Sequence, residues 1–147
     1  HVVSQEVISR IHAGMIIGCY VSIKDELNTS EILKYCFEHN IDICTPKVVG
    51  RTLCFYKIKS YDDLVPAPFG LLEPTLTVHI PVDKIDMMIV PLSSYDSENH
   101  RTGYGKGYYD SILMDCRNRI GVAFQEQEVD LIDIGTHDIT LDEIISA

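Results

Sequence analysis

Positively charged side chains are scarce in this sequence of 147 residues. Lys and Arg together number 12 against 22 Asp and Glu, which gives a formal net charge of −10 at pH 7. A field of this sign repels phosphates, so we expect no general affinity for nucleic acid or for an anionic membrane. Any anionic ligand has to be held locally, by a few fixed cations, by backbone N–H groups or by a divalent metal.

Long apolar runs are also missing. The longest, such as residues 87–92, fall far short of the roughly 20 residues that a membrane-spanning helix needs, and no signal-peptide pattern opens the chain. The 5 cysteines are scattered without C-x-x-C spacing, which indicates neither a disulfide framework nor a zinc site. Together these absences predict a cytoplasmic protein.

The residues that are present suit one hydrophobic core. A hydrophobic content of 46% in a chain of 147 residues predicts a single domain over residues 1–147. The chain opens on His1 rather than Met, and a helical pattern is already under way by Val3. We therefore expect the native N-terminal segment to be absent from this sequence.

Apolar periodicity divides the chain into alternating helices and strands. In the first part of the chain we expect a helix through Val3, Val7, Ile8 and Ile11, a buried strand over residues 15–21, and a helix that is capped by Thr29 and ends near Asn40. Strands over 41–49 and 52–58, joined by a tight turn, and a long connection over 60–81 follow. The last part is expected to contain a central buried strand over 85–92, a polar loop over 93–106, a helix over 107–116 and a buried strand over 120–124. This alternation predicts an α/β fold, a three-layer sandwich whose mainly parallel central sheet is flanked by helices.

A glycine-rich stretch, residues 101–110, connects the central strand to the following predicted helix. In this arrangement the unpaired N–H groups at a helix N-terminus can face an anion. Gly103, Gly105 and Gly107 alternate, which allows positive φ angles and close approach of the backbone to a ligand, and Arg101 and Lys106 supply dense positive charge. The stretch therefore predicts a site for nucleotide phosphates.

Carboxylates near the same loop suggest a metal. Asp110 lies one helical turn beyond Lys106 and could reach a Mg²⁺ ion that bridges phosphates, and Asp96 is a second candidate. The alternative is that the glycines form a simple turn whose tyrosines, Tyr104, Tyr108 and Tyr109, pack on the core. Short glycine motifs alone do not decide between these readings, because they have many false positives.

A longer set of motifs is more specific and extends over nearly the whole chain. It comprises Val90-Pro91, Tyr95-Asp96, the string Asn99-His100-Arg101-Thr102-Gly103-Tyr104-Gly105-Lys106-Gly107-Tyr108-Tyr109-Asp110, Asp25-Glu26-Leu27-Asn28-Thr29, Phe69-Gly70-Leu71-Leu72-Glu73-Pro74, Gly121-Val122-Ala123-Phe124-Gln125 and His137-Asp138. In order and spacing these motifs resemble the 5-formyltetrahydrofolate cyclo-ligase family, also called methenyltetrahydrofolate synthetases. The resemblance implies an ATP- and Mg²⁺-dependent conversion of 5-formyltetrahydrofolate to 5,10-methenyltetrahydrofolate, with small-molecule partners and a monomeric enzyme.

The resemblance also implies roles for particular residues. ATP is expected at Arg101, Thr102, Gly103, Tyr104, Gly105, Lys106, Gly107, Tyr108 and Tyr109, with Arg101, Lys106 and Tyr108 acting in catalysis. The folate is expected at Ile23, Asn28, Tyr104, Gly105, Lys106, Gly107 and Tyr108. Asp110 and Asp138 match the family's Mg²⁺ carboxylates.

Three positions depart from the family pattern. No Lys or Arg precedes His1 to contact ATP, Asn28 stands where an acidic residue commonly contacts the pterin, and Thr102 replaces a usual Leu, which we expect to change packing only. The first two departures support an alternative, a non-catalytic folate- or nucleotide-binding relative. An unrelated α/β transferase or sugar-phosphate isomerase is a second alternative, against which the string over residues 101–110 argues.

Overall fold

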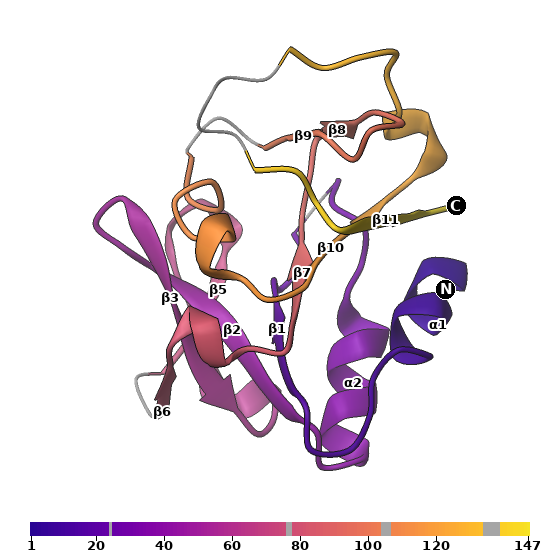
Figure 1. Ribbon diagram of the computed structural model, residues 1–147. Coiled ribbons are helices and arrows are strands. Elements are labelled where there is room, and N and C mark those ends of the chain that lie inside the picture. The colour runs from indigo at the N-terminus through magenta and orange to yellow at the C-terminus, as the bar shows by residue number, and fades with distance from the viewer. Residues whose placement is uncertain (24, 76–77, 104–106, 134–138) are drawn as a thin grey trace.

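A seven-stranded sheet forms the centre of the computed structural model, which describes residues 1–23, 25–75, 78–103, 107–133 and 139–147 (Figure 1). The strands run in the order β11 (Glu143–Ser146), β10 (Arg119–Ala123), β7 (Met87–Val90), β1 (Ile16–Cys19), β2 (Asp42–Val49), β3 (Thr52–Ile58) and β6 (Val78–Ile80). Neighbouring strands from β11 to β2 are parallel, whereas β3 and β6 pair antiparallel. The α/β class and the mainly parallel sheet are confirmed.

Strand β7 lies between β1 and β10 and is buried along its whole length. Met87 and Ile89 belong to the core on one face of the sheet, and Met88 and Val90 belong to the core on the other. A parallel strand covered on both faces needs an apolar side chain at every position, which explains its continuous apolar run. The prediction of a central buried strand in this segment is confirmed.

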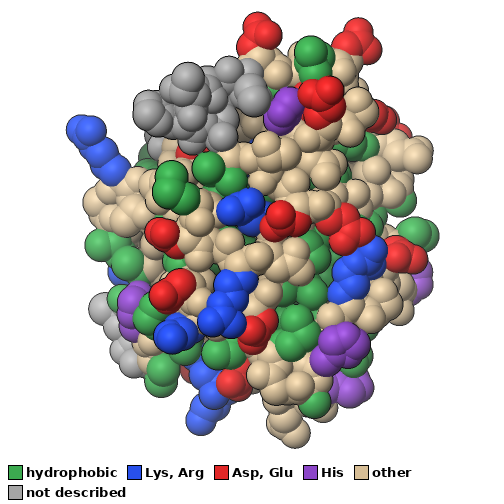
Figure 2. Space-filling view, in the orientation of Figure 1, with side chains coloured by type: hydrophobic (Ala, Val, Ile, Leu, Met, Phe, Trp, Pro, Cys, Tyr) green, Lys and Arg blue, Asp and Glu red, His purple; other side chains and the backbone are tan. Residues whose placement is uncertain are grey.

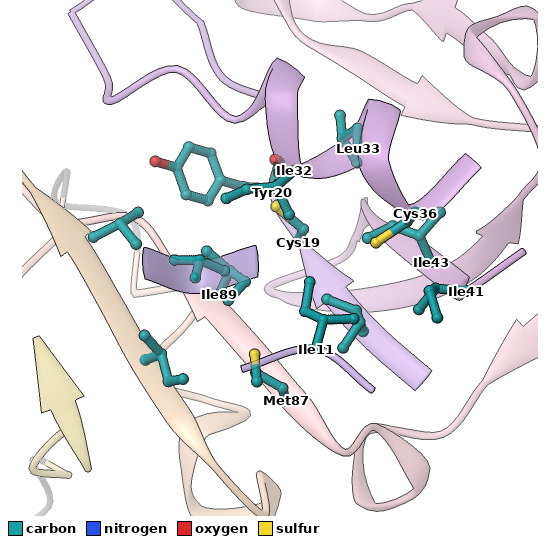
Figure 3. Close-up of a cluster of buried hydrophobic side chains, with 14 of the residues drawn as sticks. Ile11, Cys19, Tyr20, Ile32, Leu33, Cys36, Ile41, Ile43, Met87 and Ile89 are labelled. Atoms are coloured by element: carbon teal, nitrogen blue, oxygen red, sulfur yellow. Dashed lines mark hydrogen bonds between the residues drawn. The ribbon is translucent and has the colours of Figure 1, made fainter. Parts of the chain in front are cut away.

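Both α-helices of the described residues pack on one face of this sheet (Figure 1). They are α1 (Val2–Ile8) and α2 (Ser30–Glu38). On α2, the buried side chains Ile32, Leu33 and Cys36 follow helical spacing, and Figure 3 shows them beside residues of β1 and β2. None of the helices in the described ranges is long and apolar enough to cross a membrane.

In the part of the chain that the structure describes, the opposite face is covered by turns rather than by an α-helix. The helix predicted over residues 107–116 is wrong, because this segment forms a series of turns that ends in the 3₁₀ helix η4 (Leu113–Asp115). Gly107 begins it with φ +71°, and the Ser111 hydroxyl donates to the Tyr108 carbonyl (2.7 Å), a local bond that competes with helical pairing. Leu113 nevertheless packs inward with Met88 and Val90, so the covering layer has a hydrophobic inner surface.

The connection predicted over residues 60–81 contains regular structure. Its elements are η1 (Tyr61–Asp63), β4 (Leu64–Pro66), η2 (Pro68–Gly70), β5 (Leu72–Pro74) and the sheet-edge strand β6, and η3 (Val82–Lys84) follows. Strands β4 and β5 pair antiparallel as an isolated ribbon. Proline donates no N–H, yet it is tolerated in such ribbons because their outer edges have no ladder to complete. Because of the prolines in this connection, the sequence pattern did not predict its three short strands.

All 5 cysteines are free thiols, and Cys54 alone among them is not buried. Cys116 lies at the end of η4 and packs inward. Burial raises the pKa of its thiol to about 11, so it is protonated at neutral pH. A nucleophilic role for Cys116 is correspondingly disfavoured.

Candidate functional site

The loops that carry the predicted site residues follow the carboxyl ends of neighbouring parallel strands, and this end of the sheet is called the site edge below. Strands β1 and β7 are parallel neighbours, with Ile17 opposite Met87 and Cys19 opposite Ile89. The chain after β1 leads to residues 20–29, and the chain after β7 leads to a small hairpin and the glycine-rich stretch. Ligands of open α/β sheets bind beyond the carboxyl ends of the strands, so this edge is the candidate site.

The hairpin after β7 consists of β8 (Ser94–Tyr95) and β9 (Arg101–Thr102). It places Arg101 directly opposite Tyr95, at the start of the glycine-rich stretch. The Arg101 Nε donates to the Pro91 carbonyl (3.2 Å), and a terminal nitrogen pairs with an Asp110 oxygen (3.0 Å). The Arg101 side chain is only 5% exposed, so these contacts fix a charged group in one orientation.

Gly103 lies against the Arg101 side chain. A Cβ at this position would stand 2.6 Å from a terminal nitrogen of Arg101, closer than real Cβ contacts allow. Because the guanidinium is already held by Pro91 and Asp110, it has little freedom to retreat. The glycine is therefore required here by close packing against the cation, and Gly107 is required by its positive φ.

Thr102 corrects one expectation. Its hydroxyl hydrogen-bonds the hydroxyls of Ser93 (2.7 Å) and Ser94 (2.5 Å), across the base of the hairpin. The exchange from the family's Leu therefore introduces hydrogen bonds and does not change packing only. The Thr102 side chain ties the two hairpin strands together, and this position has a structural role beside its predicted place in the ATP site.

The tyrosines at the start of the 107–116 turns pack on the core, which supports part of the alternative reading of the motif. Tyr108 and Tyr109 are both partly buried against the core that covers the turn side of the sheet. The Tyr109 ring faces the Arg101 guanidinium at 6.0 Å, and its buried hydroxyl has no hydrogen-bond partner among the described residues. Burial raises the pKa of Tyr109 well above its ordinary value, so Tyr109 stays neutral.

Asp110 is suited to a cation. Its carboxylate is 53% exposed and already lies next to Arg101, the group expected to hold phosphate. Carboxylate oxygens are the usual protein ligands of Mg²⁺, which typically takes only one or two of them. Within the described ranges no group of three or more His, Cys, Asp or Glu side chains is arranged to hold a metal. Four predicted site residues, Tyr104, Gly105, Lys106 and Asp138, lie outside the described residues.

Asp96, the second candidate for a metal ligand, bonds to protein groups instead. Its carboxylate is buried and accepts hydrogen bonds from the backbone of Glu98, His100 and Ile132 and from the His100 ring. Burial would raise its pKa, but these bonds outweigh that effect and lower the pKa to about 2. Both oxygens of Asp96 accept hydrogen bonds from the protein, so this side chain stabilises the hairpin from within. The metal-ligand interpretation of Asp96 is wrong.

The loop after β1 contains the residues expected to contact the folate. Ile23 is partly buried and Asn28 is exposed. The Asn28 side-chain oxygen accepts from the Ser30 N–H (2.7 Å) at the start of α2. Thr29 occupies the N-cap position but makes no side-chain cap; its hydroxyl instead donates to the Tyr20 carbonyl (2.9 Å). The capping role assigned to the Thr29 side chain is therefore wrong, and Asn28 satisfies the first N–H of α2 instead.

Two carboxylates at this edge had no assigned role. Glu26 is partly buried, accepts from the Ile23 N–H (2.8 Å), and has a pKa raised by burial. Glu73 on β5 is buried, accepts from the Val48 N–H (2.9 Å) and pairs with Lys47 (3.4 Å). Glu73 thereby provides an acceptor for the Val48 N–H at a position of β2 that no longer pairs with β1. Buried acids that pair with backbone donors give no periodic signal in a sequence.

The charges on the molecular surface are of mixed sign. Figure 2 shows basic and acidic side chains interspersed over the face that it displays. Because the net charge of −10 repels anions, a site for an anion needs a fixed local cation, and Arg101 is such a cation. An open, mainly parallel α/β sheet with a cation and glycines beyond the carboxyl end of its central strand is the arrangement in which α/β proteins commonly bind phosphate.

Comparison with known proteins gives the family. A sequence model of the 5-formyltetrahydrofolate cyclo-ligase family matches residues 1–147, and the chain belongs to this family. The family assignment made from the motifs is confirmed, and with it membership of an enzyme family.

Curated relatives and solved structures agree. The chain is 37% identical to a 5-formyltetrahydrofolate cyclo-ligase of Mycoplasma pneumoniae, over 88% of this chain and 71% of that protein. It is 27% identical to the Haemophilus influenzae 5-formyltetrahydrofolate cyclo-ligase, over 88% of this chain and 74% of that protein. The Aquifex aeolicus 5,10-methenyltetrahydrofolate synthetase structure superposes with a TM-score of 0.81 at 26% identity, covering 98% of this chain and 77% of that one.

Proposed function

We propose that this protein is a 5-formyltetrahydrofolate cyclo-ligase, which uses ATP and Mg²⁺ to form 5,10-methenyltetrahydrofolate. One observation carries the proposal: Arg101 is held by Pro91 and Asp110 against Gly103, beyond the carboxyl end of the central strand. A nearly buried cation beside an exposed carboxylate is the pairing that a metal-bound nucleotide requires. The family's motifs surround this pair in order and spacing.

The reaction is a phosphoryl transfer followed by ring closure. The formyl oxygen of 5-formyltetrahydrofolate attacks the γ-phosphorus of ATP, and the bond to ADP breaks. The neighbouring side-arm nitrogen then attacks the activated carbon and loses its proton, and phosphate leaves with the former formyl oxygen. An amide-like oxygen is a poor leaving group, and phosphorylation makes it a good one, so catalysis is mostly positioning and charge stabilisation.

Each part of the site has a role in this proposal. Arg101 orients the phosphates and stabilises their charge, Lys106 stabilises the group in transfer, and Tyr108 borders both substrates. Asp110 and Asp138 would hold the Mg²⁺ ion, which supplies positive charge between the phosphates. The turn at residues 23–28 would receive the pterin, since it lies beyond β1, the neighbour of the strand that leads to Arg101.

A non-catalytic folate- or nucleotide-binding relative is the second candidate, favoured by Asn28 at a position that is commonly acidic. One assay separates the two. Purified protein with Mg-ATP and 5-formyltetrahydrofolate is expected to develop the near-ultraviolet absorbance of the methenyl product, in proportion to enzyme concentration. Binding of both substrates by calorimetry without any product would establish the non-catalytic alternative.

Exchange of Asp110 for Asn tests the metal assignment. We expect Asp110→Asn to raise the Mg²⁺ concentration for half-maximal activity by about tenfold, because an amide oxygen lacks the charge that attracts a hard cation. Asp115→Asn is the matched control, since Asp115 is an exposed carboxylate on the same turn segment. The rate is measured against Mg²⁺ concentration at saturating ATP. Equal Mg²⁺ requirements in all three proteins would contradict the metal role of Asp110.

Exchange of Asn28 tests the folate assignment. An ionised oxygen at this position should tighten 5-formyltetrahydrofolate binding by ~1 kcal/mol, or roughly fivefold, with ATP affinity unchanged. Two variants separate binding from helix capping. Asn28→Asp keeps an acceptor at the same reach for the Ser30 N–H, whereas Asn28→Glu moves it away and should lower stability by about 1 kcal/mol. Calorimetry and thermal unfolding measure both effects. Folate affinity that is unchanged in both folded variants would show that Asn28 does not face the pterin.

A further inference from the structure

Asp96 is the most completely bonded carboxylate in the described part of the site edge. Its side chain is 0% exposed, and its two oxygens divide their hydrogen bonds between two tasks. The Oδ1 atom accepts from the Glu98 and His100 N–H groups (both 3.0 Å), within the hairpin turn. The Oδ2 atom accepts from the His100 ring (2.9 Å) and from the Ile132 N–H (2.9 Å), which lies 36 residues further along the chain.

The bond to Ile132 is one of several between the hairpin and the segment after β10. The Tyr95 carbonyl accepts from the Val129 N–H (2.8 Å), and the Asn99 carbonyl accepts from the Leu141 N–H (3.0 Å). Ile132 and Leu141 are therefore both attached to the hairpin. Asp96 supplies a buried side-chain acceptor in this set, and it follows Tyr95, the partner of Arg101 across the hairpin.

We propose that Asp96 is a positioning residue for the nucleotide site, holding the hairpin that carries Arg101 against residues 129–132. This inference rests on the proposed function, because it assigns Arg101 to Mg-ATP. The carboxylate is suited to the task because buried backbone donors are satisfied best by an ionised acceptor, which bonds about twice as strongly as a neutral one. An amide at this position has a single acceptor oxygen and would leave the Ile132 N–H without its side-chain acceptor.

The variant Asp96→Asn separates the two tasks of the carboxylate. Its amide oxygen can replace Oδ1 and keep the Glu98 and His100 N–H bonds of the turn. Its NH₂ group then points where Oδ2 stood, and it cannot accept from the Ile132 N–H. The hairpin turn is preserved while its attachment to Ile132 is removed. Glu98→Gln is the matched control, because Glu98 lies in the same turn and its side chain is 66% exposed.

We expect Asp96→Asn to weaken binding of a non-hydrolysable Mg-ATP analogue by about tenfold. This is the lower end of the effect on affinity when a residue that supports a binding group from behind is lost. Affinity for 5-formyltetrahydrofolate should fall less than affinity for the Mg-ATP analogue, because the part of the folate site after β1 makes none of these bonds. The KM for ATP should rise accordingly, and by more than the KM for folate. Glu98→Gln should match the wild type in every measurement.

Calorimetric titration of both ligands into the three proteins measures these affinities, and amide hydrogen exchange reports the bond itself. The Ile132 amide should exchange slowly in the wild type and rapidly in Asp96→Asn. Unchanged Mg-ATP affinity in a folded Asp96→Asn protein, or an equal loss for both ligands, would overturn the positioning role. Rapid exchange at Ile132 in the wild type would overturn it without any variant. A wild type that binds neither ligand would instead refute the proposed function.

Discussion

Replacement of Arg101 by lysine should lower kcat/KM for ATP by about 100-fold, a loss of ~2.7 kcal/mol of transition-state stabilisation. The variant keeps the positive charge, so the expected loss comes from geometry. Arg101 uses Nε to hold the Pro91 carbonyl and a terminal nitrogen to hold Asp110. A lysine carries its donors on one nitrogen and cannot make both contacts while facing a phosphate in the fork geometry of a guanidinium.

The surroundings of Arg101 make this loss hard to compensate. Its side chain is 5% exposed, and Gly103 leaves room for the guanidinium at a distance that a Cβ would forbid. The Tyr109 ring lies against the same group. A flexible lysine would lose the fixed position of the guanidinium over the Tyr109 ring and beside Gly103, so the ammonium would sample several positions.

Arg117→Lys is the control for a general effect of exchanging arginine. Arg117 pairs with Asp86 (3.3 Å) and its side chain is 57% exposed, so its replacement should leave both the rate and the stability unchanged. Steady-state rates at varied ATP, with thermal unfolding of each protein, provide the measurement. A folded Arg101→Lys protein with wild-type kcat/KM would remove Arg101 from the catalytic site.

Much of the sheet could be predicted because its signals are local. The apolar run at Met87–Val90 marks a strand buried on both faces, and the spacing of Ile32, Leu33 and Cys36 marks the inner side of α2. Strand β3 was predicted with the bounds observed, Thr52–Ile58, because the short turn at Gly50 separates it from β2. Apolar periodicity and turn residues were sufficient for these elements.

The errors in the fold share a physical cause, which is competition from side chains and backbone geometry that periodicity does not record. The segment after Gly107 has apolar residues at helical spacing, yet Ser111 bonds to the Tyr108 carbonyl and the last turn tightens to a 3₁₀ helix. Strands β4 and β5 contain prolines, which a single-sequence pattern takes for a loop. Strands β4 and β5 become regular only through their pairing with each other, which a local pattern does not record.

The candidate site was predictable in composition and less so in arrangement. The motif identified Arg101 and Asp110, and the structure pairs them at 3.0 Å. It could not distinguish Asp96 from Asp110, since a buried acid that accepts four protein hydrogen bonds and an exposed acid look alike in a sequence. The same limitation applies to Thr29 and Asn28, neighbours that exchange the expected capping role. Partners distant in the sequence decide each of these cases.

The Lys106→Ala variant should lower kcat by about 100-fold while the KM for ATP changes little, since the cation acts mainly on charge that develops during transfer. Lys106 lies outside the described residues, and its position in the sequence, between Gly105 and Gly107 and five residues after Arg101, motivates this expectation. In a protein of net charge −10, few cations are available to replace it. Asp110 already pairs with Arg101, so a second cation is needed for the transferred group.

Two further variants make the test of Lys106 specific. Lys106→Arg restores a positive charge and should recover part of the lost rate, whereas Lys84→Ala removes an exposed lysine from η3 and should have no effect. Single-turnover rates at saturating ATP and folate separate the transfer step from product release. If the rate constant of Lys106→Ala equals that of the wild type while the protein remains folded, charge on the transferred group is stabilised elsewhere. An increase confined to the KM for ATP, with kcat unchanged, would instead assign Lys106 to ground-state binding, because only interactions stronger in the transition state raise kcat.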